Sequence, residues 1–313
     1  MLKPKVSVIG AGNVGLRYVY SLMISGFARS IAILDKNRER TEGEVMDLKS
    51  CMPFVSQIEI SVGDYKDLKD SDIVVITAGA KQKPGQARLE LVKENIAIFK
   101  EIIPKVMEYA PRAIFLVVTN PVDVLSYAAY KISKKPYQEV IGSGTVLDSA
   151  RLRLLLSQHC NIDARNVHAY VLGEHGDSEF AVWSRAMIGG ILFKEYCPMC
   201  NKCDTKTALS DIFGEVKDFA YKVIQKKGET SYGVGLSMTM ITRAILKDEN
   251  SILPVSCLVE DYYGVNDVYL SMPSIVNKNG IREVFKIKLN EEEENNFKNS
   301  AKILKAVIEQ SGL

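Results

Sequence analysis

The stretch that decides the fold reads Gly10-Ala11-Gly12-Asn13-Val14-Gly15 and lies near the start of the chain. A short apolar run precedes it, a helical pattern follows it, and a second apolar run ends at Asp35, 20 residues after Gly15. The glycine spacing alone is weak evidence. The order of the elements is stronger evidence. A strand, the glycines, a helix, a second strand and an acid follow one another, and this order predicts a dinucleotide-binding βαβ unit.

Each residue of this pattern has a physical task. Gly10 allows the tight turn, Gly12 lets the backbone approach a pyrophosphate, and Gly15 lets helix and strand pack closely. The free N–H groups at the start of the helix suit the phosphates. Asp35 would accept hydrogen bonds from the adenosine ribose and repel a 2′-phosphate, which favours NAD over NADP. The alternative is that Asp35 is only a polar turn residue.

Apolar strand patterns continue at residues 72–78, 114–119 and 139–141, with helical stretches such as residues 89–109 between them. Apolar strands that alternate with helices predict an α/β fold with a parallel sheet covered on both faces. Ligands bind at the carboxyl ends of such strands. We therefore expect the segments that follow these ends to lie beside the cofactor, namely Ala78-Gly79-Ala80 and Thr119-Asn120-Pro121.

The second half of the chain alternates short strands with long helices and has no second glycine pattern. We expect strands at residues 166–172 and 252–259, and a helix at residues 209–226. A final helix has one apolar face, made of Phe297, Ala301, Leu304 and Ile308. The length of 313 residues favours two domains.

His175 is the first candidate for chemistry. It is one of three histidines and lies in Gly173-Glu174-His175-Gly176-Asp177. Glycine lets a ligand approach closely, and an imidazole can give or take a proton near neutral pH. We interpret His175 as an acid–base group. The alternative is a turn that holds an incidental histidine.

Asp148 and Arg151 share one face of a helix because they are three residues apart. They could form an exposed ion pair. They could also be an acid that orients His175 and a guanidinium that grips a carboxylate with two parallel hydrogen bonds. Arg153 is rotated from Arg151 by about 200° at 3.6 residues per turn, so we expect it to face away from that ligand.

The polar stretch at residues 81–91 interrupts the regular alternation and holds Pro84 and Gly85. It is either a solvated connection or a lid that carries Gln82 and Arg88 over a bound substrate.

The composition fits an ordinary soluble globular protein, with 47% hydrophobic and 25% charged residues. A net charge of +2 gives no sign of nucleic acid or of a membrane surface. We see no apolar run of about 20 residues that could span a membrane and no apolar signal-peptide core. Six cysteines in a chain of this length do not make a disulfide scaffold, which favours the cytoplasm.

Three cysteines, Cys197, Cys200 and Cys203, have a spacing that invites a zinc or iron–sulfur interpretation. A structural zinc ion is bound by four ligands, and no further cysteine or histidine lies nearby in the sequence. Residues 195–205 read as a polar surface connection, so we expect no metal site.

Together the motifs resemble the lactate/malate dehydrogenase family over nearly the whole chain, and within it the bacterial L-lactate dehydrogenases. The resemblance rests on GAGNVG at residues 10–15, Asp35, GAKQKPGQARLEL at 79–91, VTNPVD at 118–123, GSGTVLDSARLR at 142–153, GEHGD at 173–177 and KGET at 227–230. It implies a Rossmann NAD-binding domain at residues 1–142 and a mixed α/β substrate domain at residues 143–313.

The resemblance also implies a role for each site residue. His175 is the acid–base group and Asp148 its partner, Arg151 anchors the substrate carboxylate, and Arg88 polarises the substrate carbonyl. Gln82, Asn120 and Thr230 line the substrate pocket with them. The positions at which the family contacts NAD are Gly10, Gly12, Val14, Gly15, Asp35, Arg40, Tyr65, Gly79, Ala80, Val118, Thr119, Asn120 and Ser143.

The implied activity is reversible hydride transfer between NADH and pyruvate, with His175 as proton donor and L-lactate as the product. The setting would be glycolysis and pyruvate fermentation. Gln82 stands where the malate branch carries an arginine, and a second carboxylate would be desolvated there without a partner. The alternatives are a malate dehydrogenase, another L-2-hydroxy acid dehydrogenase, or a non-catalytic NAD-binding protein.

Arg153 and His168 match positions that bind fructose 1,6-bisphosphate in bacterial members of the family. The resemblance implies a homotetramer, in equilibrium with dimers, that this effector stabilises by removing repulsion between facing cationic pairs. The alternative is that Arg153 makes a structural ion pair and His168 is an interface residue.

Overall fold

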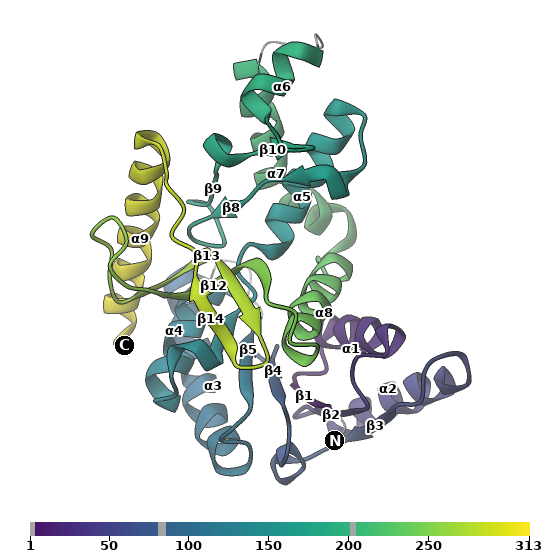
Figure 1. The fold of residues 1–313 in the computed structure, drawn as a ribbon. Helices are drawn as coiled ribbons and strands as arrows, with labels where there is room; N and C mark the ends of the chain where they lie inside the picture. The colour runs from purple at the N-terminus through teal and green to yellow at the C-terminus, as the bar shows by residue number, and fades with distance from the viewer. Residues whose placement is uncertain (1–3, 81–85, 201–204) are drawn as a thin grey trace.

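The computed structural model describes residues 4–80, 86–200 and 205–313 (Figure 1). The first half of the chain builds six parallel strands in the order β3-β2-β1-β4-β5-β6. The strands are β1 (Lys5–Ile9), β2 (Ser30–Leu34), β3 (Glu59–Val62), β4 (Ile73–Ile76), β5 (Ile114–Val117) and β6 (Val140–Gly142). The predicted α/β fold with a parallel sheet is confirmed.

Continuous burial explains why the sequence patterns located these strands. Every residue of β4 and β5 is buried, and so are the last four residues of β1 and of β2. A strand covered on both faces reads as an uninterrupted apolar run. The strand β3 was not predicted, because Glu59 and Ser61 break its apolar pattern at the edge of the sheet.

The helices of the first half connect these strands. They are α1 (Asn13–Ser25), α2 (Arg38–Ser50), α3 (Arg88–Tyr109), α4 (Val122–Ser133) and α5 (Val146–Cys160), with short 3-10 turns η1 (Met52–Phe54), η2 (Tyr65–Leu68) and η3 (Tyr137–Glu139). The side chain of Asn37 accepts the N–H of Arg40 at 3.1 Å and so caps the start of α2. Gly26, with φ of 67°, ends α1 in the left-handed conformation.

The parallel sheet continues into the second half of the chain. Strand β12 (Ser251–Val259) runs antiparallel to β6, where Ser256 faces Gly142, and β13 (Val268–Asn277) and β14 (Gly280–Val284) follow. One nine-stranded sheet therefore contains strands from both sides of residue 142. The division into domains at residues 1–142 and 143–313 stays a prediction.

Two small sheets and the helices α5, α6 and α7 make up the region drawn in teal and green in the upper part of Figure 1. Its further elements are β7 (Val167–His168), β8 (Val171–Leu172), β9 (Phe180–Ala181), β10 (Met187–Ile188), β11 (Ile191–Leu192), α6 (Phe193–Cys200), α7 (Thr205–Lys227), η4 (Ala164–Asn166) and η5 (Trp183–Arg185), and α8 (Tyr232–Leu246) follows α7 and lies lower, beside α1. A second apolar cluster forms its core, separate from the cluster around the large sheet.

Two sequence predictions are wrong in this region. The single strand expected at residues 166–172 is two strands, because β7 pairs with β10 whereas β8 pairs with β9 in another sheet. The polar connection expected at residues 195–205 begins inside α6. Phe193 and Cys197, four residues apart, put an apolar face of that helix into the second core.

Long helices join the two halves. Helix α8 packs on α1 so closely that a Cβ on Gly235 would lie 2.8 Å from the carbonyl carbon of Arg17. The buried hydroxyls of Tyr18 and Thr242 meet at 2.7 Å across the same contact. Helix α9 (Glu291–Ser311) buries Phe297, Ala301, Leu304 and Ile308, as its apolar face predicts. Among the described residues, no helix combines the length and the apolar character needed to cross a membrane.

Candidate active site

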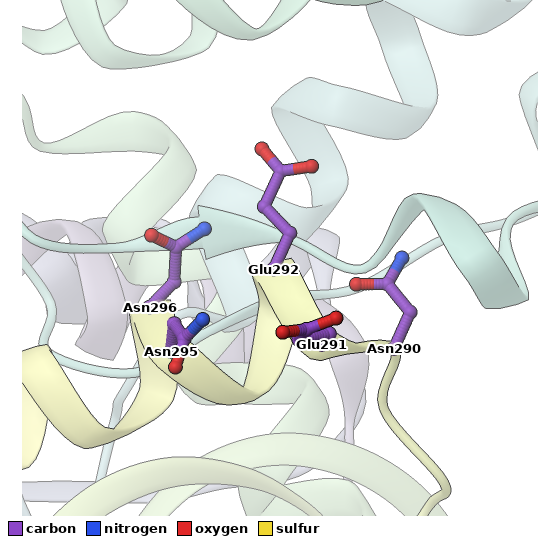
Figure 2. A pocket seen from close by; sticks show the side chains of 5 residues that line it. All are labelled: Asn290, Glu291, Glu292, Asn295 and Asn296. Atoms are coloured by element: carbon purple, nitrogen blue, oxygen red, sulfur yellow. The ribbon is translucent and has the colours of Figure 1, made fainter.

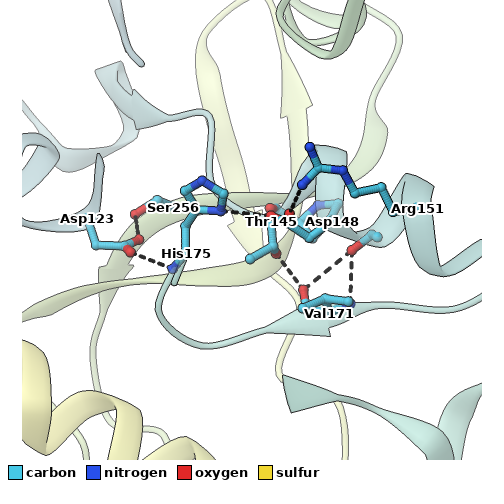
Figure 3. A network of polar contacts seen from close by, with 9 residues as sticks. Asp123, Thr145, Asp148, Arg151, Val171, His175 and Ser256 are labelled. Atoms are coloured by element: carbon cyan, nitrogen blue, oxygen red, sulfur yellow. Dashed lines mark hydrogen bonds and ion pairs between the residues drawn. The ribbon is translucent and has the colours of Figure 1, made fainter. Parts of the chain in front are cut away.

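The carboxylate of Asp148 lies at the centre of the candidate site (Figure 3). Its Oδ2 is 2.7 Å from Nδ1 of His175, and its Oδ1 accepts a hydrogen bond from Nη1 of Arg151 at 2.9 Å. The side chains of Asp148 and Arg151 are only 4% and 9% exposed, so the alternative of an exposed helix ion pair is wrong. The three-residue spacing on α5 brings the acid and the guanidinium together, and a loop between β8 and β9 delivers His175.

This arrangement favours the charged form of the imidazole. Burial lowers the pKa of His175, but the negative charge and hydrogen bond of Asp148, helped by Glu179 and Asp123, raise it to about 9. Burial likewise opposes charge on Asp148, yet His175 and Arg151 hold its pKa below the ordinary value. At neutral pH the pair is therefore an imidazolium beside a carboxylate, which is a stored proton ready for donation.

A second carboxylate, Asp123, holds the main chain of His175. Oδ2 of Asp123 accepts the backbone N–H of His175 at 2.7 Å, and Oδ1 accepts the hydroxyl of Ser256 at 2.6 Å. Asp123 is 1% exposed, and burial raises its pKa to about 6 against the two hydrogen bonds. Asp123 was not among the site residues predicted from the sequence. An acid in the first turn of α4 is ordinary helix chemistry, so no local signal marked it.

The loop around His175 is also fixed from α9. The hydroxyl of Ser300 accepts the N–H of Glu174 at 2.6 Å and meets the hydroxyl of Ser178 at 2.9 Å. Gly173 has φ of 91°, and a Cβ there would lie 2.8 Å from Oγ of Ser300. The glycine before His175 is therefore required by close packing as well as by backbone conformation.

A pocket of about 350 Å³ opens beside Arg151. Its lining is mostly apolar and consists of Leu147, Ala150, Arg151, Leu154, Phe219, Val223, Lys227, Thr230, Ser231, Tyr232 and Gly233. Two predicted substrate residues, Arg151 and Thr230, meet here although they are far apart in the sequence. A buried guanidinium in an apolar pocket can bind a small carboxylate.

A larger hollow lies elsewhere, at the start of α9 (Figure 2). It is lined by Asn290, Glu291, Glu292, Asn295 and Asn296, all exposed polar side chains. None of the predicted site residues lines it. It has no part in the candidate site.

The glycine turn has room where a cofactor would need it. A Cβ added to Gly12 would have no atom within 4 Å, whereas one on Gly15 would lie 2.1 Å from the carbonyl oxygen of Gly10. Gly15 is thus needed for packing and Gly12 leaves space for a ligand. Asp35 accepts the N–H of Ala11 at 2.7 Å on Oδ2 and that of Asn37 at 2.9 Å on Oδ1.

The other predicted cofactor residues follow the carboxyl ends of the parallel strands. Gly79 and Ala80 come after β4, Val118, Thr119 and Asn120 after β5, and Ser143 after β6. Val14 lies in the first turn of α1 and Tyr65 begins η2 after β3, whereas Arg40 is exposed on α2 with Nη2 3.5 Å from Glu44. All of them, with Arg40 in the first turn of α2 after β2, follow the carboxyl ends of parallel strands, which fits a dinucleotide.

Some of the predicted site residues belong to the part of the chain outside the described residues. Gln82 and Cys203 lie outside the described residues, and so do the side chains of Arg88 and Cys200. Cys197 is buried in the second apolar core, and the absence of a metal site at the three cysteines stays a prediction. Asn120 is exposed, and its carbonyl oxygen accepts a hydrogen bond from Nδ2 of Asn95 at 3.1 Å.

The two predicted effector residues lie away from the substrate pocket. Arg153 is half-buried on α5 beside Tyr170, and burial lowers its pKa. Within the described part of the chain, its Nε has no hydrogen-bond partner. His168 is exposed on β7 and faces Met187 of β10. Their role as an effector site stays a prediction.

Comparison with known proteins agrees with this geometry. Residues 4–142 match the family domain described as the lactate/malate dehydrogenase NAD binding domain, and residues 145–312 match the alpha/beta C-terminal domain of the same family. L-lactate dehydrogenase 1 of Clostridium acetobutylicum is 53% identical over 306 residues, which cover 97% of each chain.

Two solved structures are also similar. A lactate dehydrogenase from a Medee basin deep-sea metagenome library superposes with a TM-score of 0.97 at 42% identity, covering 100% of both chains. The minor L-lactate dehydrogenase of Enterococcus mundtii, in its ligands-bound form, gives a TM-score of 0.95 at 39% identity over 98% of both chains. The chain has the NAD-binding domain and the fold of these enzymes, and it belongs to the lactate/malate dehydrogenase family.

Proposed function

We propose that this chain is an NAD-dependent L-lactate dehydrogenase that interconverts pyruvate and L-lactate. The observation that carries the proposal is the buried row Arg151–Asp148–His175, with Nη1 to Oδ1 at 2.9 Å and Oδ2 to Nδ1 at 2.7 Å. It places a carboxylate-binding cation and a proton donor on either side of one acid. A non-catalytic NAD-binding protein would not need this row.

The residues divide the reduction of a 2-oxo acid between them. NADH, when bound at the glycine turn, supplies the hydride that reduces the carbonyl carbon. His175, held as an imidazolium, gives its proton to the carbonyl oxygen, and the new O–H and C–H bonds make the hydroxyl group. Asp148 stabilises the charged ring before the transfer and orients it. Arg151 binds the substrate carboxylate with the rest of its guanidinium fork.

Two further roles rest on the sequence resemblance. Arg88 would stabilise negative charge that develops on the carbonyl oxygen, an effect that grows when water is excluded. Gln82, Asn120 and Thr230 would line the substrate pocket. Replacing Arg88 by Gln should lower kcat for pyruvate far more than it weakens NADH binding, which a fluorescence titration of NADH measures separately.

Pyruvate is favoured over oxaloacetate by the pocket around Thr230. Among the lining residues that the structure describes, the cations are Arg151 and Lys227, and Nζ of Lys227 lies 3.8 Å from the centre of the Tyr232 ring and donates to Ser231 at 3.3 Å. A second substrate carboxylate would lose its water without a matching fork of donors. Comparison of kcat/KM for pyruvate and oxaloacetate tests this. A preference for oxaloacetate would instead support a malate dehydrogenase, and a preference for a bulkier 2-oxo acid another L-2-hydroxy acid dehydrogenase.

We further propose a homotetramer, in equilibrium with dimers, that fructose 1,6-bisphosphate activates through Arg153 and His168. Support comes from Arg153, a half-buried residue whose buried Nε lacks a hydrogen-bond partner among the described residues, and from the exposed residue His168. A doubly anionic ligand would join such cationic pairs across an interface, and binding would stabilise the tetramer.

Sedimentation and pyruvate kinetics with millimolar effector, at slightly acid pH and low protein concentration, test the regulation. We expect a larger mass and a lower KM, both lost in Arg153→Gln. The matched control is Arg165→Gln, because Arg165 is 89% exposed and pairs with Asp163. No change in mass or KM in the wild type would leave Arg153 and His168 as structural residues.

The cellular setting and the domain division are also proposals. A reaction that consumes pyruvate and NADH fits pyruvate fermentation at the end of glycolysis in the cytoplasm, and cell fractionation followed by the pyruvate assay tests the location. We propose domains at residues 1–142 and 143–313, since the family domains match residues 4–142 and 145–312.

A further inference from the structure

Glu179 is a buried acid that the mechanism above does not use. It ends the tight turn after His175, where its backbone N–H donates to the carbonyl of Gly176 at 3.1 Å, and the next residue, Phe180, pairs with Leu172 across β8 and β9. The residue is 5% exposed. Its carboxylate, the carboxylate of Asp148 and a ring nitrogen of His175 lie within 4.8 Å of one another.

Charged groups from three segments act on Glu179. Asp148 and Arg151 come from α5, His175 comes from the same loop, and Lys217 comes from α7. Lys217 is also engaged at the loop surface, where its Nζ donates to the carbonyl of Asp177 at 3.0 Å. Two carboxylates thus share a small buried space, and they cannot both be charged at little cost.

The surroundings of the two acids move their pKa values in opposite directions. Burial and the charge of Asp148 raise the pKa of Glu179 to about 8, although His175, Lys217 and Arg151 oppose this. The pKa of Asp148, by contrast, is lowered by His175 and Arg151. Two neighbouring carboxyl groups whose pKa values move apart take different tasks, one as a charge and one as a held proton.

We propose that Glu179 is a positioning residue that holds a second proton in the active site, and that a 2-oxo acid anion binds only while Glu179 is protonated. The proposal rests on the proposed function, because the ligand is the anionic substrate. With Glu179 neutral, the charges of the buried groups Asp148, Asp123, His175 and Arg151 sum to zero at neutral pH. Ionisation of Glu179 would leave a net negative charge where the substrate carboxylate must bind, and in a poorly solvated site the resulting repulsion is large.

The two protons are linked. An ionised Glu179 holds the proton on His175 more tightly, so the pair titrates as a unit rather than as two independent groups. Substrate binding and proton donation need both protons, one on Glu179 and one on His175. The alkaline fall of kcat/KM for pyruvate therefore reflects the loss of two protons instead of one.

The experiment measures kcat/KM for pyruvate at saturating NADH, from about pH 6 to 10, in wild type and in Glu179→Gln. Gln is neutral at every pH and has nearly the same shape. On the alkaline side of the profile, we expect kcat/KM of wild type to approach a fall of about a hundredfold per pH unit. For the variant we expect a fall of about tenfold per pH unit. The loss should fall mainly on KM. Glu179→Asp should keep the two-proton limb, and Glu292→Gln, at an exposed acid on α9, should leave the profile unchanged.

A second measurement needs no turnover. Infrared difference spectra of the cofactor-free protein between about pH 6.5 and 9.5 should contain a carboxylic acid band that Glu179→Gln removes. If wild type reduces pyruvate but both proteins have the same limb, or if no such band exists, Glu179 is a structural acid. If wild type does not reduce pyruvate while the band is present, the proposed function is wrong, but the proposal that Glu179 holds a proton stands.

Discussion

Oδ2 of Asp123 accepts the backbone N–H of His175 at 2.7 Å, so a carboxylate on α4 fixes the main chain of the residue whose ring faces Asp148. Backbone and ring of His175 are thus held by two different acids from two different helices. The ring can change its charge while its Cα stays in place. A proton donor that transfers over a short distance needs this constancy of position.

Asp123→Asn tests the backbone anchor. Asp123 accepts two donors, the N–H of His175 and the hydroxyl of Ser256, but an amide has only one oxygen. If that oxygen keeps the His175 N–H, the hydroxyl of Ser256 can turn and accept from the amide nitrogen, and the variant loses the strength of a hydrogen bond to a charged acceptor, about 1–3 kcal/mol. We expect kcat/KM for pyruvate to fall by about 10- to 100-fold. Ser256→Ala, which removes one donor and leaves the anchor, should cost clearly less, and equal losses in both variants would contradict this account.

Asp148→Asn tests the stored proton. The pKa of His175 is about 9 because Asp148 outweighs the effect of burial. Without that charge the pKa of the ring should fall, because only the weaker effects of Glu179 and Asp123 then oppose burial. The alkaline limit of pyruvate reduction should move to lower pH, and at a fixed alkaline pH the rate should drop about tenfold for every pH unit that the limit moves. A profile of unchanged position, with only a lower plateau, would mean that Asp148 orients the ring without setting its charge.

The same proton should affect stability. Since the pKa of His175 is raised in the folded state, to about 9 from an ordinary 6.5, its contribution is complete below pH 6.5 and is lost as the pH rises through 9. Glu179, also raised, loses its contribution in the same direction. Urea unfolding at a fixed protein concentration should give a steeper loss of free energy across this window in wild type than in His175→Asn. If the free energy of unfolding falls with pH in the same way in both proteins, the proton on His175 does not contribute to stability.

Two glycine variants separate cofactor binding from folding. Gly12→Ala adds a methyl group where no protein atom lies within 4 Å, so the cofactor-free protein should keep nearly its full Tm. The methyl group would occupy the space of the pyrophosphate and weaken NADH binding at least about tenfold. Gly15→Ala places a Cβ 2.1 Å from the carbonyl oxygen of Gly10, and should destabilise the fold by about 3 kcal/mol. Thermal unfolding and NADH fluorescence measure the two effects, and a Gly12→Ala variant that binds NADH normally would exclude this turn as the phosphate site.

Sequence patterns predicted those features of the fold and the site that depend on residues close together in the chain. The glycine turn, the buried strands and the shared helix face of Asp148 and Arg151 follow from spacing and polarity alone. Asp123 and Glu179 could not be found this way, because their burial depends on segments that only the folded chain brings together. Asp123 touches a residue 52 positions later, and Ser256 reaches it from 133 positions away. The bend that splits residues 166–172 into two strands has no glycine or proline to mark it.

The junction of β6 and β12, where Ser256 faces Gly142, has a consequence for any attempt to cut the molecule in two. Residues 4–142 made alone would leave β6 as an uncovered strand with free backbone donors and acceptors, and the complementary piece would leave β12 in the same state. Such edges pair with whatever chain is available. Separate expression should therefore yield aggregates, whereas co-expression of the two pieces should let each edge find its proper neighbour and return a complementing enzyme.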